Sequence, residues 1–492
     1  MVPPMLLSRV FVALLSALAL LISARASDAA IDGNAWVSLD GKGNQYNLAS
    51  GAYSYPPSPS DDGALVALES LAPLDFDLDK NGLTDVFVRN TVDFATGLVS
   101  ANPDGVAGNG RSYGPTMSGD GNFVAFESLA SDLVADDTNN AADILLRDRV
   151  EGITVRVSGP SGGNADGPSY RAAISHDGGW VAFCSRATNL TEGDANGLAD
   201  VFLWERATGA ITRIEVAGSA DSASDGCLRV AVSGDAGVIA FSAVTGGSAG
   251  VFVHERATGS TTRLDPEANG PSGTGGMAVS GDGNTVVFDS VADNLIAEDT
   301  NRSRDVFAYD RAAATTSRVS VRTSGSQLPG NSGDSGVSVD GDGRYVVFGS
   351  TARGVVPGDS NGREDVFRRD LTEGETAIVS INISGQSANN SSYSPAINAD
   401  GSVVAFTSMA ANLVGGDGNR QPDVFIRGTT FPENAGSESG PEDTGAPAEE
   451  ETAPIVATDD DSSPLLLYGA IAGGVIVLLI AASLLLGRRG RA

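Results

Sequence analysis

Histidine, cysteine and lysine are scarce in this sequence of 492 residues, which holds two of each. Two cysteines cannot build a disulfide framework or a cysteine-based zinc site. The two histidines, His176 and His254, leave few options for histidine-dependent catalysis. Because the chemistry of all three residue types is nearly absent, we predict that the protein is not an enzyme.

Aromatic residues and positive charge are also in short supply. Aromatics make up 6% of the chain and glycine contributes 62 residues, a composition rich in turns and poor in long helices. The 31 Lys+Arg residues face 62 Asp+Glu, for a net charge of −31. A surface this acidic repels phosphate backbones, so we expect no nucleic-acid partner. It suits cations, basic partners or a salty medium.

Each end of the chain carries an apolar run, and the two runs predict different segments. Residues 1–26 resemble a signal peptide, because Arg9 precedes the apolar run Val10–Ile22 and an A-x-A cleavage site ends at Ala26. An uncleaved anchor is the alternative for this end. The 22 residues Leu465–Leu486 contain no charge and are long enough to cross a bilayer. We predict a transmembrane helix at 464–487, with a buried core helix as the alternative.

The charges around the second run predict how the chain is placed. The tail at 488–492 is basic, and positive charge stays in the cytoplasm. Residues 431–463 hold ten acids and no Lys or Arg, with many Pro, Gly, Ser and Thr, which is typical of a disordered stalk. We therefore expect an exported, single-pass membrane protein, with its body outside the cytoplasm and its C-terminus inside.

The body, residues 27–430, consists of seven copies of one repeat. The copies begin at Ser60, Ser118, Ser175, Ser233, Ser280, Asp340 and Asn398, mostly 57–60 residues apart. The third copy predicts four short strands, at Tyr170–Ile174, Trp180–Ser185, Asp200–Glu205 and Ile211–Val216. Seven units of four strands with Asp-Gly turns indicate an all-β, seven-bladed β-propeller. A linear β-solenoid is the alternative.

The two ends of the repeat region favour a closed ring. The last copy stops after its third strand, Asp423–Arg427. The N-terminal segment Ala35–Asp40, "AWVSLD", is similar to the fourth strands "TVRVS" and "TSRVS" of other copies. A strand from the N-terminus that completes the last blade would remove an open sheet edge. We predict this closure at Ala35–Asp40.

The turn pattern S-x-D-G-x-x-V-A-F followed by D-V-F resembles the WD40-like repeats of TolB-type propellers. The resemblance covers the seven copies and implies an exported propeller that binds proteins or ligands. TolB itself carries a separate N-terminal α/β domain, for which we expect no counterpart in this chain. The resemblance therefore does not imply a role in the Tol–Pal system.

An acidic loop recurs between the second and third strands. Six of the seven copies carry Asp-x-Asn-x-x-x-Asp there, and the first copy is the fullest, with Asp75, Asp77, Asp79, Asn81 and Asp85. Alternating oxygen ligands around a glycine turn suit Ca²⁺, although the glutamate that ends an EF-hand loop is missing. Two interpretations stay open. Either these residues cap their own turns, or the five ligate Ca²⁺ as the protein's cofactor.

The two cysteines fall at neighbouring strand ends. Cys184 ends a second strand, and Cys227 begins the first strand of the next copy. In a propeller these ends lie on the same face, between adjacent blades. A disulfide suits an exported chain, and two buried free thiols are the alternative.

Together these features predict a non-catalytic binding or scaffold module. Its partner, a protein or a glycan, would meet the Asp-rich loop face, and the C-terminal helix would meet the membrane. The alternative is a glycan lyase or hydrolase that uses paired carboxylates at the ring centre. Acids that converge on the channel mouth would favour the enzyme, whereas acids spread evenly around the rim would favour binding.

Overall fold

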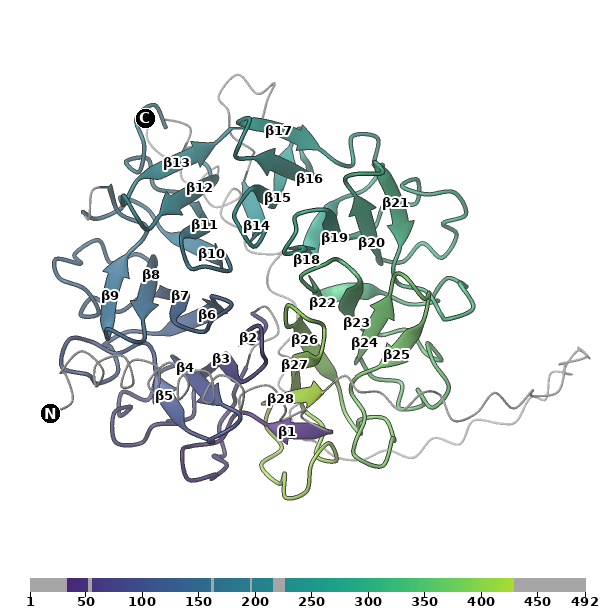
Figure 1. The fold of residues 1–492 in the computed structure, drawn as a ribbon, viewed down its shortest axis with the longest axis horizontal. Helices are drawn as coiled ribbons and strands as arrows, with labels where there is room; N and C mark the ends of the chain where they lie inside the picture. Colours follow the sequence, from purple (N-terminus) through teal and green to yellow (C-terminus); the bar gives the residue numbers. More distant parts are fainter. Residues whose placement is uncertain (1–32, 52–54, 161–162, 195–196, 216–225, 429–492) are drawn as a thin grey trace, which may run out of the picture. The chain divides into compact units, whose positions relative to one another are not determined.

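The computed structural model describes residues 33–51, 55–160, 163–194, 197–215 and 226–428, which form seven antiparallel sheets of four strands each (Figure 1). The sheets follow one another as blades around a common centre, so the all-β, seven-bladed propeller predicted from the repeats is confirmed. The predicted signal peptide, stalk, transmembrane helix and tail lie outside the described residues. Within the described part of the chain, no helix has the length and apolar character needed to cross a membrane.

The blades are numbered in chain order, and each takes its strands from inside to outside. Their strands are, for blade 1, β2 (Ser58–Pro59), β3 (Leu65–Ser70), β4 (Asp85–Asn90) and β5 (Thr96–Leu98); for blade 2, β6 (Ser112–Met117), β7 (Phe123–Ser128), β8 (Asp143–Asp148) and β9 (Ile153–Arg156); for blade 3, β10 (Ser169–Ile174), β11 (Trp180–Ser185), β12 (Asp200–Glu205) and β13 (Ile211–Ile214); for blade 4, β14 (Cys227–Val232), β15 (Val238–Thr245), β16 (Ser248–Glu255) and β17 (Ser260–Arg263); for blade 5, β18 (Ser272–Val279), β19 (Thr285–Ser290), β20 (Asp305–Asp310) and β21 (Thr315–Arg318); for blade 6, β22 (Ser332–Val339), β23 (Tyr345–Ser350), β24 (Asp365–Asp370) and β25 (Thr376–Ile378); and for blade 7, β26 (Ser392–Ile397), β27 (Val403–Ser408), β28 (Asp423–Gly428) and β1 (Asn34–Trp36).

The second and third strands of each blade form the core of the propeller. Both faces of these strands are covered by neighbouring blades, so they read as continuous apolar runs rather than alternating ones. Phenylalanines from the two strands lie opposite each other, as Phe183 and Phe202 do in blade 3, where their ring centroids are 5.7 Å apart. The apolar clusters join adjacent blades; one contains Ala125 of blade 2 and Phe183 of blade 3.

The Asp-Gly turns that mark the repeat connect the first strand to the second. In blade 3 the Ser175 hydroxyl donates to Asp177 Oδ1, which also accepts the N–H of Gly179. Gly178 has a φ of +64°, a conformation that costs an L-residue energy and that glycine adopts freely. The sequence signature S-x-D-G is therefore a turn that caps itself.

The N-terminal strand closes the ring, one residue earlier than the sequence predicts. The strand β1 is Asn34–Trp36, not Ala35–Asp40, and its residues pair with Phe425–Arg427 of β28. The regular pairing ends at Trp36, because the N–H groups of Val37 and Ser38 both donate to the carbonyl of Val424. Val37 is fully buried, and Ser38 Oγ–H donates to Asp423 Oδ1 at 2.7 Å. The blade that was short of a strand is thereby completed.

A register shift in the first strand of blades 2–7 shapes the centre of the propeller. In blade 3 the regular pairing with β11 is interrupted between Tyr170 and Ala173. In blade 4 it is interrupted between Cys227 and Arg229. Such bulges re-aim side chains, and here they lie at the end of the channel that faces the Asp-rich loops.

Candidate functional site

The recurring aspartate at the start of the third strand accepts a hydrogen bond from a buried serine inside the propeller. In blade 5 the Ser320 hydroxyl donates to Asp305 Oδ1 at 2.6 Å and accepts the N–H of Val306 at 3.1 Å. This links the third strand to the segment after the fourth. The same bond recurs in the pairs Asp85–Ser100, Asp143–Ser158, Asp365–Ser380 and Asp423–Ser38. Burial raises the pKa of this carboxyl, to about 7 for Asp85 and Asp365.

The asparagine of the loop motif caps the turn. Asn301 Nδ2 donates to Asp305 Oδ2 and to the carbonyl of Leu328, both at 2.9 Å, while its Oδ1 accepts the N–H of Ser303. Asn81, Asn139, Asn361 and Asn419 make the corresponding bonds to their own aspartates. The asparagine of blade 3, Asn196, lies outside the described residues. In the described loops, these asparagines therefore act as structural residues.

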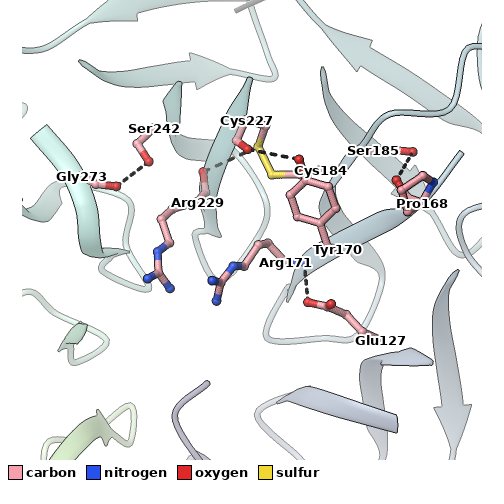
Figure 2. Close-up of a disulfide and its surroundings, with 10 residues drawn as sticks. All are labelled: Glu127, Pro168, Tyr170, Arg171, Cys184, Ser185, Cys227, Arg229, Ser242 and Gly273. Atoms are coloured by element: carbon pink, nitrogen blue, oxygen red, sulfur yellow. Dashed lines mark hydrogen bonds between the residues drawn. A yellow bond between two sulfur atoms is a disulfide. The ribbon is translucent and has the colours of Figure 1, made fainter. Parts of the chain in front are cut away.

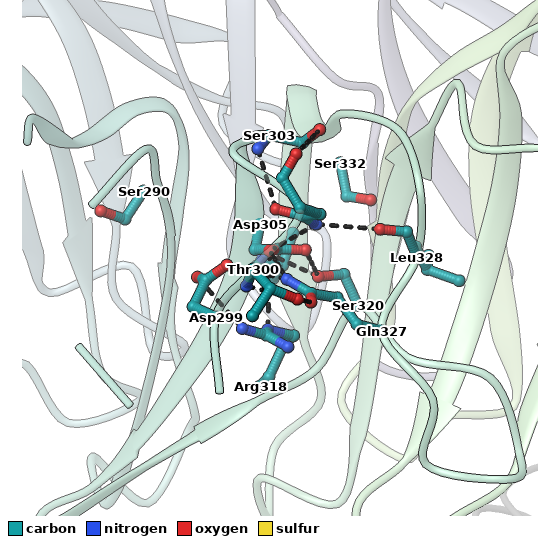
Figure 3. A network of polar contacts seen from close by, with 12 residues as sticks. Ser290, Asp299, Thr300, Ser303, Asp305, Arg318, Ser320, Gln327, Leu328 and Ser332 are labelled. Carbon is teal, nitrogen blue, oxygen red and sulfur yellow. Dashed lines mark hydrogen bonds and ion pairs between the residues drawn. The ribbon is translucent and has the colours of Figure 1, made fainter. Parts of the chain in front are cut away.

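An arginine lies between the two loop aspartates in three blades (Figure 3). Arg318, the last residue of β21, is 3.0 Å from Asp299 and 3.5 Å from Asp305. Arg156 and Arg213 hold the equivalent places in blades 2 and 3. The loop acids of these blades are thus neutralised from within, which leaves the loop face less available to a basic partner than the sequence suggests.

Blade 4 has an equivalent hydrogen-bond network, but its aspartate occupies the position that serine has in the other blades. Its short turn at Gly246–Gly247 replaces the acidic loop, and Gly250 stands where other blades have the aspartate. Asp265 stands in place of the serine: its Oδ1 accepts the N–H of Val251 and pairs with Arg263, each at 3.0 Å. The carboxylate of blade 4 therefore lies after the fourth strand instead of at the start of the third, and it still links the two strands.

The five predicted metal ligands of blade 1 are not gathered around one point. Asp77 is exposed and Asp75 half-buried, whereas Asp79 is buried with 2% of its surface exposed. Asn81 and Asp85 are bonded to each other in the turn network. Among the described residues, no three His, Cys, Asp or Glu side chains lie close enough together to hold a metal ion by themselves.

The two cysteines form a disulfide in the structure (Figure 2). Cys184 is the second-last residue of β11 and Cys227 is the first residue of β14, and their Cα atoms are 5.7 Å apart. In blades 1, 2 and 5 the position of Cys184 is held by an acid, Glu69, Glu127 or Asp289. Glu69 and Glu127 each accept a backbone N–H from the next blade, whereas Asp289 accepts two from the first strand of its own blade. The disulfide is the covalent counterpart of those contacts between blades.

Loss of the disulfide is expected to destabilise the propeller by about 2–4 kcal/mol. The bond closes a loop with a sequence separation of 43, which restricts the unfolded chain. Urea unfolding of the wild type with and without reductant measures the effect. A Cys184→Ser/Cys227→Ser variant serves as the control, because its midpoint should match the reduced wild type and ignore the reductant. Equal midpoints for oxidised and reduced wild type would contradict the prediction.

The centre of the propeller contains a hollow of about 280 Å³. It is lined by the first strands of successive blades, including Tyr55, Arg171, Arg229, Met277 and Ser335. Most of the lining is backbone and small side chains. The two arginines therefore dominate its electrostatics.

Arg171 and Arg229 come from neighbouring blades and extend side by side in Figure 2. Both are the third residue of their strand, at the bulge. The Arg171 guanidinium stacks 4.5 Å from the ring of Tyr55, and Arg229 Nη2 lies 3.5 Å from the carbonyl of Thr274. Burial and the charge of Arg171 lower the pKa of Arg229 to about 10, so Arg229 stays cationic at neutral pH. Two adjacent cations in a concave site attract an anionic group.

The conformation of Arg171 is strained. Its φ is +58°, in the left-handed region, where blade 2 has a glycine, Gly114. The strain is held by Glu127, whose Oε1 accepts the N–H of Arg171 at 2.7 Å. Strained residues in a pocket that the surrounding structure fixes are typical of functional positions.

The acids at the channel mouth support the backbone rather than line the hollow. Glu127 is 1% exposed and Asp289 is fully buried, and each accepts backbone N–H groups at the bulges. Burial raises the pKa of Glu127 to about 7. The hollow is therefore lined by guanidinium groups, while Glu127 and Asp289 are buried outside its lining.

The chain matches no protein-family model and no curated protein. Its repeats form a seven-bladed propeller, and the solved structures similar to it include TolB propellers. TolB from Acinetobacter baumannii is similar at 14% identity and a TM-score of 0.34, over 59% of this chain and 60% of that one. This chain thus spans less than two thirds of that TolB.

Two other solved propellers cover more of the chain. An oligogalacturonate lyase from Vibrio parahaemolyticus has a TM-score of 0.49 at 12% identity, over 81% of this chain and 98% of its own. The β-propeller domain of the Trilobed protease from Pyrococcus furiosus has a TM-score of 0.48 at 10% identity, over 77% and 95% of the two chains. These similarities concern the fold.

Proposed function

We propose that this protein is a non-catalytic binding module that takes a carboxylate of a protein partner into the mouth of its central channel. The observation that carries the proposal is the pair Arg171 and Arg229, which line one hollow in a chain with a net charge of −31. Guanidinium groups bind carboxylates through paired, charge-assisted hydrogen bonds. The strain at Arg171 supports a role beyond stability, because glycine would fit that position better.

The surrounding charge favours a partner with basic residues around the carboxylate. The arginines lie at the end of the channel that faces the acidic loops, since each is the third residue of a strand that starts on that side. The loop acids of blades 1, 6 and 7 have no arginine between them, so a ligand acidic throughout would be repelled there. A ligand with one acid among basic residues would match both the centre and the rim.

Two Lys-rich peptides that differ only in a central Glu or Gln test the proposal by calorimetry. The Glu peptide is expected to bind the wild type roughly tenfold or more tightly than the Gln peptide, because a charge-assisted hydrogen bond contributes about 1.5–3 kcal/mol. Arg171→Gly should abolish the difference. Its melting temperature should stay close to that of the wild type, since glycine relieves the strain at this φ.

Arg206→Gly is the control for the loss of one positive charge. Arg206 follows β12 at the opposite end of blade 3 and is exposed. This variant should keep the preference for the Glu peptide. Equal affinity of the wild type for the two peptides would refute a carboxylate site, whatever their absolute affinity.

The alternative is a carboxylate-dependent glycan lyase or hydrolase, and the observation that favours it is the set of acids near the mouth. Glu127 stands beside Tyr55 and Arg171, with a pKa of about 7. Incubation with acidic and neutral polysaccharides, followed by an assay for new reducing ends, tests this alternative. New reducing ends that disappear in Glu127→Gln would establish the enzyme.

We also propose that the propeller is exported and tethered by the C-terminal helix at 464–487. The support is in the sequence: the run Val10–Ile22, the uncharged run Leu465–Leu486 and the basic tail after it. In this arrangement the loop face would be open to partners outside the cytoplasm.

A further inference from the structure

Asp79 is a buried carboxylate that lacks a partner. It is 2% exposed, and neither of its oxygens accepts a hydrogen bond from a described residue. Burial raises the pKa of Asp79, and the N–H of Asn81 opposes this rise without reaching hydrogen-bonding geometry. Among the ion pairs of the described residues, none includes Asp79, not even with the adjacent Lys80.

The repeat shows what is missing at this position. In blade 5, Phe307 pairs with Arg318, whose guanidinium lies between the two loop aspartates. In blade 1 the equivalent residue Phe87 pairs with Leu98, which carries no charge. The isolated bridges that follow the fourth strands place Ala107 where blade 5 has Gln327. Blade 1 has thus lost both donors that bind these carboxylates elsewhere.

Blades 6 and 7 also lack the arginine but compensate for it. In blade 7, Gln45 Nε2 donates to Asp417 at 3.0 Å and to Asp423 at 3.2 Å. In blade 6, Asp359 is half-buried, and its Oδ2 accepts the N–H of Val355. Of the loop acids that the structure describes, Asp79 is the buried one with neither a hydrogen bond nor an ion pair.

A buried carboxylate without a partner is costly, because it has lost its hydration without compensation. Asp85 is fully buried as well, and Asn81, the second residue after Asp79, donates to its Oδ2 at 2.7 Å. The two carboxylates therefore act on the same small volume. A cation there would restore the balance that arginine provides in other blades.

We propose that Asp79 and Asp85 bind a Ca²⁺ ion at the point in blade 1 where an arginine guanidinium lies in blades 2, 3 and 5. Ca²⁺ accepts mixed ligand sets of carboxylates, backbone carbonyls and waters, so two carboxylates are a sufficient protein core. A hollow of about 430 Å³ adjoins the site and gives an entry path; Asp79, Lys80 and Gly82 line it beside four apolar residues. Of the five residues that the sequence suggests as Ca²⁺ ligands, this proposal keeps two, Asp79 and Asp85.

A thermal melt of the full-length chain, followed by tryptophan fluorescence, tests the site. All three tryptophans lie in blades 3 and 7, so the signal reports on the propeller. At Ca²⁺ about a hundredfold above Kd, the melting temperature should rise by roughly 3–5 °C over that in EDTA at equal ionic strength. Mg²⁺ and Na⁺ at the same ionic strength should have smaller effects, since the site offers few ligands of fixed geometry.

Two variants separate the site from general stability. Asp79→Asn should lose the response to Ca²⁺ while remaining folded. Leu98→Arg should also lose it, with a melting temperature in EDTA close to that of the Ca²⁺-loaded wild type, because the guanidinium can stack on Phe87 as Arg318 does on Phe307. Asp299→Asn in blade 5 is the matched control: it should lower the melting temperature but keep the full Ca²⁺ response.

The contrary results are equally specific. No shift of the wild type by Ca²⁺ would overturn the proposal. A shift that persists in both Asp79→Asn and Leu98→Arg would place the Ca²⁺ elsewhere and would overturn it as well. Neither result tests the carboxylate site at Arg171, because that site is measured separately, by calorimetry with the two peptides.

Discussion

Deletion of residues 33–40 is expected to lower the free energy of unfolding by about 4–8 kcal/mol and to open the ring. The segment contributes a fully buried Val37, the buried bond from Ser38 to Asp423, and the Trp36 ring, 5.9 Å from Phe425. Each is worth a few kcal/mol or less, and they act together. Urea unfolding of the deletion variant beside the wild type measures the loss.

A point variant and a peptide make this test sharper. Val37→Asp should reproduce most of the loss, whereas Leu48→Asp, at a position 41% exposed, should leave stability nearly unchanged. A synthetic peptide of residues 33–45 added to the deletion variant should restore the melting temperature in a concentration-dependent way. An unchanged midpoint for the deletion would show that the N-terminal strand does not hold the ring closed.

Asp305→Ala is expected to destabilise the propeller by about 3–5 kcal/mol. The change removes the carboxylate that the Ser320 hydroxyl donates to, one of the two acceptors of the Asn301 amide, and one of the two aspartates beside Arg318. A buried cation that has lost one partner is the costly part, because its desolvation is no longer compensated. Urea unfolding followed by fluorescence gives the value.

Asp365→Ala in blade 6 is the matched comparison. Asp365 accepts the equivalent bonds from Ser380 and Asn361, but the place of the arginine is held by Ile378. Asp365→Ala should lower the free energy of unfolding by about 1–3 kcal/mol, because two donors lose this acceptor. Similar losses for the two variants would show that the arginine contributes little to the network.

The architecture could be predicted from the sequence because each copy repeats the same local signals. The self-capping turn at Ser175 and Asp177 and the apolar run that starts at Trp180 fix a hairpin without reference to the rest of the chain. The Val-Ser pair of the closing segment also occurs after the fourth strands of other blades, as Val319 and Ser320 show. Its strand limits could not be predicted, because they depend on how Val37 and Ser38 meet the distant β28.

The candidate sites were harder to predict, because their residues depart from the repeat. Arg171 and Arg229 occupy a position that other copies fill with Gly114 or Ser394, and only the bulge turns that position into the mouth of the channel. A comparison of the copies position by position would have marked the two arginines. The loop acids stood out in the sequence, but most of them bind inward, which the pattern alone does not reveal.

The closure of the last blade also means that β1 can pair only after nearly the whole propeller has been synthesised. Asn34 contacts Arg427, a residue 393 positions later in the chain. At about 5–20 residues per second, roughly 20–80 s pass between the synthesis of the two partners. During that interval β1 has no strand to pair with, while blades 1 to 6 can each form from a continuous stretch of chain. The nascent protein therefore carries an unpaired strand edge until its final blade appears, and this stage is where aggregation or a chaperone would act on it.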